Sequence, residues 1–167
     1  KQTSEGDMAD DYADNTWTSG VVVVGGTGTP DARARLQEVA DELGRGGRPV
    51  RIVVVPGPVG AVTACHCGQC RSLSGHYSAS FDVAEAALDW QARDGLAEYR
   101  TAGGGVRGFC GGCGSSLWFR AADGGFSVEA GAVDGPTGGR LALHIFVGEK
   151  GSYYDIDDGL PQFSNWD

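Results

Sequence analysis

The sequence CHCGQC occupies residues 65–70, and the sequence CGGC occupies residues 110–113. These two clusters contain all five cysteines of the chain. An odd number of cysteines in tight clusters is more typical of a metal site than of a disulfide framework, whose cysteines would be scattered. Thiolate is a soft ligand that favours zinc over magnesium or calcium. We therefore predict a zinc site formed by Cys65, Cys67 and Cys70, with Cys110 and Cys113 at or beside the same site.

The spacing within the first cluster allows three sulfur atoms to meet at one ion. Side chains alternate along an extended backbone, so Cys65 and Cys67 project to the same side while His66 projects away. Gly68 permits a turn that brings Cys70 back over them. Zinc needs this clustering because its bonds to sulfur are about 2.3 Å long and tetrahedrally arranged.

The later cluster decides between an enzyme and a scaffold. A catalytic zinc has three protein ligands and one open position, whereas a structural zinc has four ligands. The site is therefore open unless Cys110 or Cys113 completes it. A zinc ribbon separates its halves by about 15–20 residues, and the interval between Cys70 and Cys110 is much longer. A simple ribbon is a poor match, and the spacing allows both a catalytic and a structural site.

The three histidines each have an ordinary structural interpretation. His66 faces away from the metal, and His144 belongs to an apolar stretch that is typical of a buried strand. His76 lies in a polar segment close to the first cluster, which makes it the candidate for a catalytic role. Neither a carboxylate nor a histidine is clearly placed as a general base.

Charge and hydropathy exclude several classes of protein. Acidic residues outnumber basic residues by 22 to 13, and no basic run could follow a phosphate backbone, so we expect no nucleic-acid partner. The longest aliphatic run, Val21 to Val24, is far shorter than the roughly 20 residues of a membrane-spanning helix. We expect no membrane association and a cytoplasmic location. Abundant alanine, glycine and valine with few lysines is typical of a GC-rich bacterial genome.

The chain divides into three predicted segments. Residues 1–19 are polar, acidic and aperiodic, which predicts a mobile tail. Residues 20–47 contain a valine-rich strand, a glycine turn and apolar residues at helical spacing over 31–43. This extension lacks the third glycine and the following acid of a dinucleotide-binding fingerprint, so we expect a packed N-terminal strand and helix. Residues 48–163 are the predicted zinc-binding domain.

The predicted zinc-binding domain is mainly β. Short β-type runs separated by glycine-rich turns occupy residues 50–55, 77–83, 116–120, 126–130 and 141–147. A brief helix is expected only within residues 83–90. We therefore expect mostly antiparallel strands whose loops carry the cysteines.

Three stretches in this order resemble the glutathione-dependent formaldehyde-activating enzymes. They are CHCGQCR at residues 65–71, RGFCGGCGS at 107–115, and HIFVG at 144–148 running on to DGLPQF at 158–163. The resemblance covers about residues 48–163 and implies a β-tent fold with two zinc positions. It assigns the catalytic zinc to Cys65, Cys67 and Cys70, and a structural zinc to Cys110 and Cys113 together with an earlier CxC pair.

The earlier CxC pair is missing from this chain. Its expected position, just before residues 50–55, reads GRGGRP at residues 44–49. Two thiolates seldom hold zinc without further ligands, so we expect one zinc ion per chain. Arg45 and Arg48 lie where the pair would fall, and we expect a guanidinium to fill part of the vacated pocket.

The resemblance also implies a reaction class, the reversible formation or cleavage of a carbon–sulfur bond in an adduct of a thiol with an aldehyde. We expect a zinc-dependent carbon–sulfur lyase acting on such an adduct, a thioether or a related biosynthetic intermediate, with a low-molecular-weight thiol as co-substrate. The alternative is a non-catalytic, zinc-stapled module that binds another protein. Three sulfur ligands and one lighter atom favour the enzyme, and four sulfurs favour the module. The sequence does not indicate the oligomeric state.

Overall fold

The computed structural model describes residues 21–25, 51–55, 59–90, 93, 95–133 and 138–166. Its strands are β1 (Val21–Gly25), β2 (Arg51–Val55), β3 (Val62–Cys65), β4 (Ser78–Asp82), β5 (Asp89–Trp90), β6 (Leu96–Arg100), β7 (Val106–Cys110), β8 (Ser116–Arg120), β9 (Phe126–Glu129) and β10 (Leu141–Ile145). The helices within this part are α3 (Gly68–Ser74) and the short 3-10 helices η1 (Glu85–Ala87), η2 (Ala130–Ala132) and η3 (Val147–Glu149). The prediction of a mainly β chain is confirmed.

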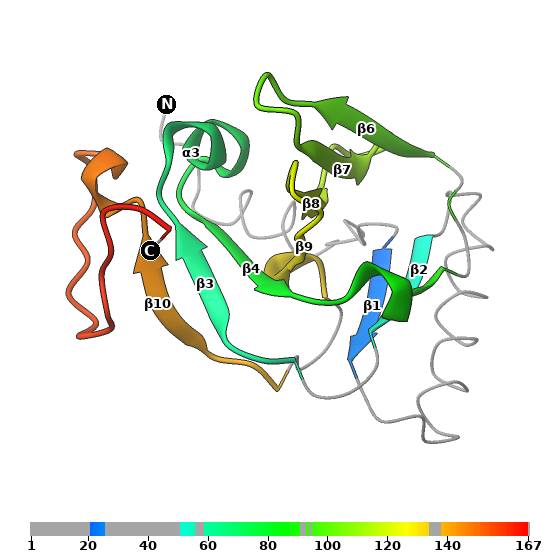
Figure 1. The fold of residues 1–167 in the computed structure, drawn as a ribbon, viewed down its shortest axis with the longest axis horizontal. Helices are drawn as coiled ribbons and strands as arrows, with labels where there is room; N and C mark the ends of the chain where they lie inside the picture. Colours follow the sequence, from blue (N-terminus) through cyan, green and yellow to red (C-terminus); the bar gives the residue numbers. More distant parts are fainter. Residues whose placement is uncertain are drawn as a thin grey trace, which may run out of the picture.

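Seven strands form the main sheet, in the order β10-β3-β4-β9-β8-β7-β6, and β1, β2 and β5 form a second sheet (Figure 1). Most neighbouring strands are antiparallel, but β10 pairs with β3, and β1 with β2, in the parallel sense. The expectation of mostly antiparallel strands is confirmed, and these two parallel pairs are the exceptions among the described strands. A parallel pair needs a long crossover connection, so it joins segments whose sequence patterns carry no sign of the partner.

The main sheet has an apolar face and a polar face. In β4, Phe81 is buried, while Ser80 and Asp82 point to the opposite side, because side chains alternate along a strand. In β9, Val128 is buried and Glu129 lies on the opposite side in the same way. The buried cluster on the apolar face contains Val59, Val62, Phe81, Leu88, Val106, Cys110, Leu117, Trp118, Phe126, Val128 and Ala132. The polar face is left to form a site.

Five strands and η1 fall where the β-type runs and the brief helix were expected. They are β2, β4, β8, β9 and β10, and β1 confirms the valine-rich strand of the extension. The patterns did not predict β3, β5, β6 and β7, and β5 lies at the end of the range in which the brief helix was expected. Strand β6 is largely exposed and β7 buries Arg107 and Gly108, so neither shows the usual alternation of apolar and polar residues. The predicted tail and the helix over residues 31–43 lie outside the described residues.

The C-terminal segment, residues 151–166, runs beside β10 at the edge of the main sheet (Figure 1, orange to red). The backbone N–H of His144 donates to the carbonyl of Pro161, and that of Phe163 donates to the carbonyl of His144, both at 2.9 Å. These bonds add a short parallel ladder and cover the edge of β10, which would otherwise expose unpaired backbone groups. None of the described helices is both long and apolar enough to cross a membrane.

Candidate metal centre

The first cysteine cluster joins the end of a strand to the start of a helix. Cys65 ends β3, Cys67 is the N-cap of α3, and Cys70 lies in the first turn of that helix. The sulfur of Cys67 accepts a hydrogen bond from the backbone N–H of Cys70 at 3.4 Å. The turn expected at Gly68 is thus a helical turn, and α3 was not predicted because seven residues are too few to show a period. Gly75, which ends α3 at φ 76, is the signal that could have found it.

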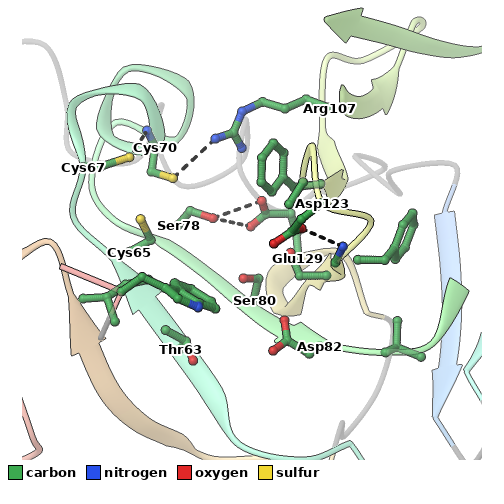
Figure 2. A pocket seen from close by; sticks show the side chains of 18 of the residues that line it. Thr63, Cys65, Cys67, Cys70, Ser78, Ser80, Asp82, Arg107, Asp123 and Glu129 are labelled. Carbon is green, nitrogen blue, oxygen red and sulfur yellow. Dashed lines mark hydrogen bonds between the residues drawn. The ribbon is translucent and has the colours of Figure 1, made fainter. Parts of the chain in front are cut away.

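The three sulfur atoms of this cluster lie within 4.8 Å of one another (Figure 2). Four ligands about 2.3 Å from a tetrahedral zinc ion lie about 3.8 Å apart, so the cluster fits zinc after small adjustments. Within the described part of the chain, no fourth histidine, cysteine or acidic residue belongs to this group. Cys65, Cys67 and Cys70 can therefore hold a metal ion, with no fourth ligand assigned among the described residues.

Hydrogen bonds among the thiols concentrate negative charge on one sulfur. The pKa of Cys67 is lowered because its sulfur accepts hydrogen bonds from Cys65 and Cys70. The pKa of Cys65 is raised by its hydrogen bonds to the same two cysteines and by burial. Cys67 is therefore the first of these two to ionise, and binding of zinc releases the protons that the other sulfur atoms retain.

Arg107 on β7 supports the cluster from one side. Arg107 is buried, and its Nη2 donates to the sulfur of Cys70 at 3.5 Å. Nη2 also donates to Oε1 of Gln69 at 2.9 Å, and Nε donates to the same oxygen at 3.3 Å. The guanidinium also lies over the ring of Phe119, 4.6 Å from its centroid. A positive charge at this distance stabilises an ionised sulfur. No sequence pattern indicated this role for Arg107, because only the sheet brings β7 to α3.

A cavity of about 820 Å³ extends from the cysteine cluster (Figure 2). Its floor is the polar face of the main sheet, formed by Thr63 on β3, Ser78, Ser80 and Asp82 on β4, and Ser127 and Glu129 on β9. Figure 2 shows Asp82 at the end away from the cysteines, with Ser78 and Glu129 between. The aromatic side chains that line it are Phe119, Phe126, Phe146 and Trp166. The cluster thus opens onto space for a small molecule.

Glu129 is a carboxylate at this cavity that the sequence patterns did not indicate. The hydroxyl of Ser78 lies 2.7 Å from one of its carboxylate oxygens and 3.0 Å from the other. Burial raises the pKa of Glu129, against the opposing effects of Ser78 and of the charge on Arg107. The pairing of β9 with β4 brings Glu129 opposite Ser80, and no local sequence signal indicates that pairing.

His76, the predicted catalytic histidine, follows α3 and is exposed. Its ring lies 4.1 Å from the ring of Tyr154 and 4.6 Å from that of Tyr77, measured between centroids. His76 is not among the described residues that line the cavity. Its catalytic role stays a prediction.

The buried His66 forms a chain of hydrogen bonds that reaches the half-buried Tyr154 and the exposed Asp158. Its Nδ1 lies 2.6 Å from the hydroxyl of Tyr154, and its Nε2 lies 2.9 Å from Nδ1 of His144. Nε2 of His144 lies 2.9 Å from a carboxylate oxygen of Asp158. Burial, and then the neighbouring His144, lower the pKa of His66 to about 4, so its ring is neutral at pH 7. The chain ties the cluster to residues 151–166, in agreement with the structural interpretation of His66.

Cys110 and Cys113 are close to each other and outside the three-sulfur group. Cys110 ends β7 in the core, and the exposed Cys113 follows in the turn, where its backbone nitrogen lies 3.4 Å from the sulfur of Cys110. The sulfur of Cys113 lies 3.1 Å from the hydroxyl of Ser115. Binding of metal by this pair stays a prediction, and Arg45 and Arg48 lie outside the described residues.

A family model described as glutathione-dependent formaldehyde-activating enzyme matches residues 49–149, more than half of the chain. The chain belongs to this family. A search of curated proteins gave no match. The residues matched by the model of the glutathione-dependent formaldehyde-activating enzyme family include the three-sulfur group, Arg107 and Glu129. Residues 150–166, which include Asp158 and Trp166, lie beyond it.

The donor atoms of the cluster fit the zinc ion that the resemblance implies. Zinc prefers ionised sulfur ligands. The cluster offers three sulfur atoms within 4.8 Å of one another, and the guanidinium of Arg107 lies beside them. Cys65, Cys67 and Cys70 line the cavity, so a metal ion that they held would be accessible to a small molecule there, as in zinc sites that act on a substrate.

Proposed function

We propose that this chain is a zinc-dependent carbon–sulfur lyase that cleaves, and in reverse forms, the bond between a thiol sulfur and an aldehyde carbon in a small-molecule adduct. The observation that carries the proposal is the three-sulfur group at one end of a cavity of about 820 Å³. Membership of the glutathione-dependent formaldehyde-activating enzyme family supports thiol-related chemistry at this site.

Cys65, Cys67 and Cys70 would hold the zinc ion. When bound, zinc supplies Lewis-acid chemistry that favours the ionised forms of nearby sulfur and oxygen atoms. Arg107 holds the sulfur of Cys70 in place and stabilises its negative charge. The hydroxyl groups on the cavity floor offer hydrogen bonds that orient a polar adduct, and the aromatic side chains limit the access of water.

The charges around the cavity bear on the identity of the thiol. Four acidic side chains line it, namely Asp82, Glu85, Asp123 and Glu129, and Arg107 is the one basic side chain among the described lining residues. Glu85 is already paired with Arg120. An adduct with excess negative charge, such as that of glutathione, is repelled by the remaining carboxylates. We therefore propose a neutral or positively charged thiol as the carrier of the aldehyde.

The test is the exchange of formaldehyde between a thiol and its S-hydroxymethyl adduct, followed by NMR with zinc-loaded protein. The wild type is expected to accelerate the exchange, and Cys67→Ser is expected to lose the acceleration. Cys113→Ser is the matched control, because it removes a cysteine outside the three-sulfur group. X-ray absorption at the zinc edge is expected to show three sulfurs and one lighter atom. Exchange at the background rate, with four sulfurs on zinc, would instead establish the non-catalytic module.

A further inference from the structure

We infer that Glu129 carries the proton in the proposed reaction, and that Ser78 positions it. This inference rests on the proposed function. Its starting point is the place of Glu129 in the sheet. Cys65 on β3 is paired with Ser78 on β4, and Ser80 on β4 is paired with Glu129 on β9.

The arrangement of the strands leaves room for a substrate between the cluster and the carboxylate. Strand β4 lies between β3 and β9, so the backbones of β3 and β9 are about 10 Å apart. Both the cluster and Glu129 line the same cavity (Figure 2). A thiol–aldehyde adduct with its sulfur at the cluster therefore has room in this cavity to turn its carbon-bound hydroxyl toward Glu129.

The surroundings of Glu129 differ from those of a structural carboxylate. Among the described residues, no arginine or lysine forms an ion pair with it, and Ser78 donates to it. Glu129 is half-buried, and a carboxylate in such a place with a hydroxyl as its hydrogen-bond partner is costlier to keep ionised than an exposed one. Burial accordingly raises its pKa, which brings the protonated and ionised forms closer in free energy near neutral pH.

Other charged groups face the same cavity from each surrounding element. Arg107 extends from β7, Asp82 from β4, Asp123 from the β8–β9 turn and Glu85 from η1, and the cysteine cluster closes one end. Arg107 lowers the pKa of Glu129 without reversing the effect of burial. The hydrogen bond from Ser78 lowers it as well, so removal of that hydroxyl raises the pKa further.

The proton transfers balance without any further reactant. In cleavage, the Glu129 carboxylate takes the proton of the adduct hydroxyl as the carbon–oxygen double bond forms. The carbon–sulfur bond breaks, and its electron pair leaves with the sulfur. Glu129 then gives the same proton to the thiolate, which departs as a thiol. In the reverse direction Glu129 takes the proton of the thiol and returns it to the new hydroxyl, so the residue ends unchanged.

The experiment compares Glu129→Gln with Glu98→Gln, an exposed position on β6 away from the cavity. Glutamine keeps the size of the side chain and still accepts from Ser78, but it cannot carry a proton. We expect Glu129→Gln to catalyse the formaldehyde exchange at least about 100-fold more slowly than the wild type. Its KM should stay within about threefold of the wild-type value and its zinc content should be unchanged, whereas Glu98→Gln should behave as the wild type. The acid limb of the pH–rate profile, present in the wild type, is expected to be lost. Infrared difference spectra should show a protonated carboxyl band that Glu129→Gln lacks.

Ser78→Ala tests the positioning role, since a merely structural role would not move the pH profile. We expect its acid limb to shift to higher pH, and Ser78→Thr to restore it. If Glu129→Gln does not fold, Glu129→Asp takes its place. We expect Glu129→Asp to turn over much more slowly than the wild type and to keep the acid limb of the pH–rate profile. Turnover at the wild-type rate in either Glu129 variant would overturn the inference and leave the proposed function intact. A wild type without exchange above background would overturn the proposed function, and the inference with it.

Discussion

Replacement of Arg107 by glutamine is expected to weaken zinc binding by roughly 10- to 100-fold. Nη2 of Arg107 lies 3.5 Å from the sulfur of Cys70, and both residues are buried. Two unit charges at that distance attract by about 5 kcal/mol at an effective dielectric constant of 20, and the cost of burying them offsets part of this. A hydrogen bond to a charged group contributes about 1.5–3 kcal/mol net, which corresponds to roughly 10- to 150-fold in affinity. Loss of a hydrogen-bond partner of a metal ligand commonly costs about 10- to 100-fold.

The assay is a competition for zinc between the protein and a coloured chelator. Arg107→Lys is expected to bind zinc with an affinity between those of the wild type and Arg107→Gln. Lysine keeps the positive charge but lacks the planar guanidinium that donates to both Cys70 and Gln69. Arg100→Gln on the exposed face of β6 is the control. Melting temperatures of the zinc-free proteins separate loss of affinity from loss of folding. An Arg107→Gln protein that folds and binds zinc as tightly as the wild type would refute the reasoning.

Four further outcomes are expected. Cys67→Ser should lose zinc and melt at a lower temperature, because part of the free energy of metal binding is folding free energy; full metal content with unchanged melting would contradict the site. Elemental analysis of protein purified without added metal should give about one zinc ion per chain, and a value near two would reveal further ligands. Three thiols of similar length compare the effect of charge: 6-mercaptohexanoate should inhibit formaldehyde exchange more weakly than 6-mercaptohexanol or the corresponding trimethylammonium thiol. Asp82→Asn should reduce this difference in inhibition. Equal inhibition by the three thiols would contradict the proposal of a neutral or positively charged thiol. Gly108→Ala should lower the free energy of unfolding, measured in urea, by about 3 kcal/mol or more, since its Cβ would lie 2.0 Å from the ring of Trp118; a change within error would show that the ring can move.

Local sequence was sufficient to predict the candidate metal ligands and the class of the fold. Three cysteines within six residues can reach one ion whether the intervening backbone is a turn or a helix, so Cys65, Cys67 and Cys70 were identified although α3 was not. Short β-type runs between glycines likewise indicated most of the strands, because alternation and turn chemistry act over neighbouring residues. The alternation also placed His66 away from the cluster, where it bonds to His144.

The tertiary structure alone decided which polar residues join the cysteines. Glu129 reaches the cavity because β9 pairs with β4. Arg107 reaches Cys70 because the fold brings β7 close to α3, although the two are far apart in the sequence. Each is an ordinary charged residue in its own segment, and nothing nearby in the sequence indicates its burial or its partner. Strand order is set by the packing of one continuous apolar face, a property of all the strands together. The polar face opposite, and the cavity on it, follow from that packing.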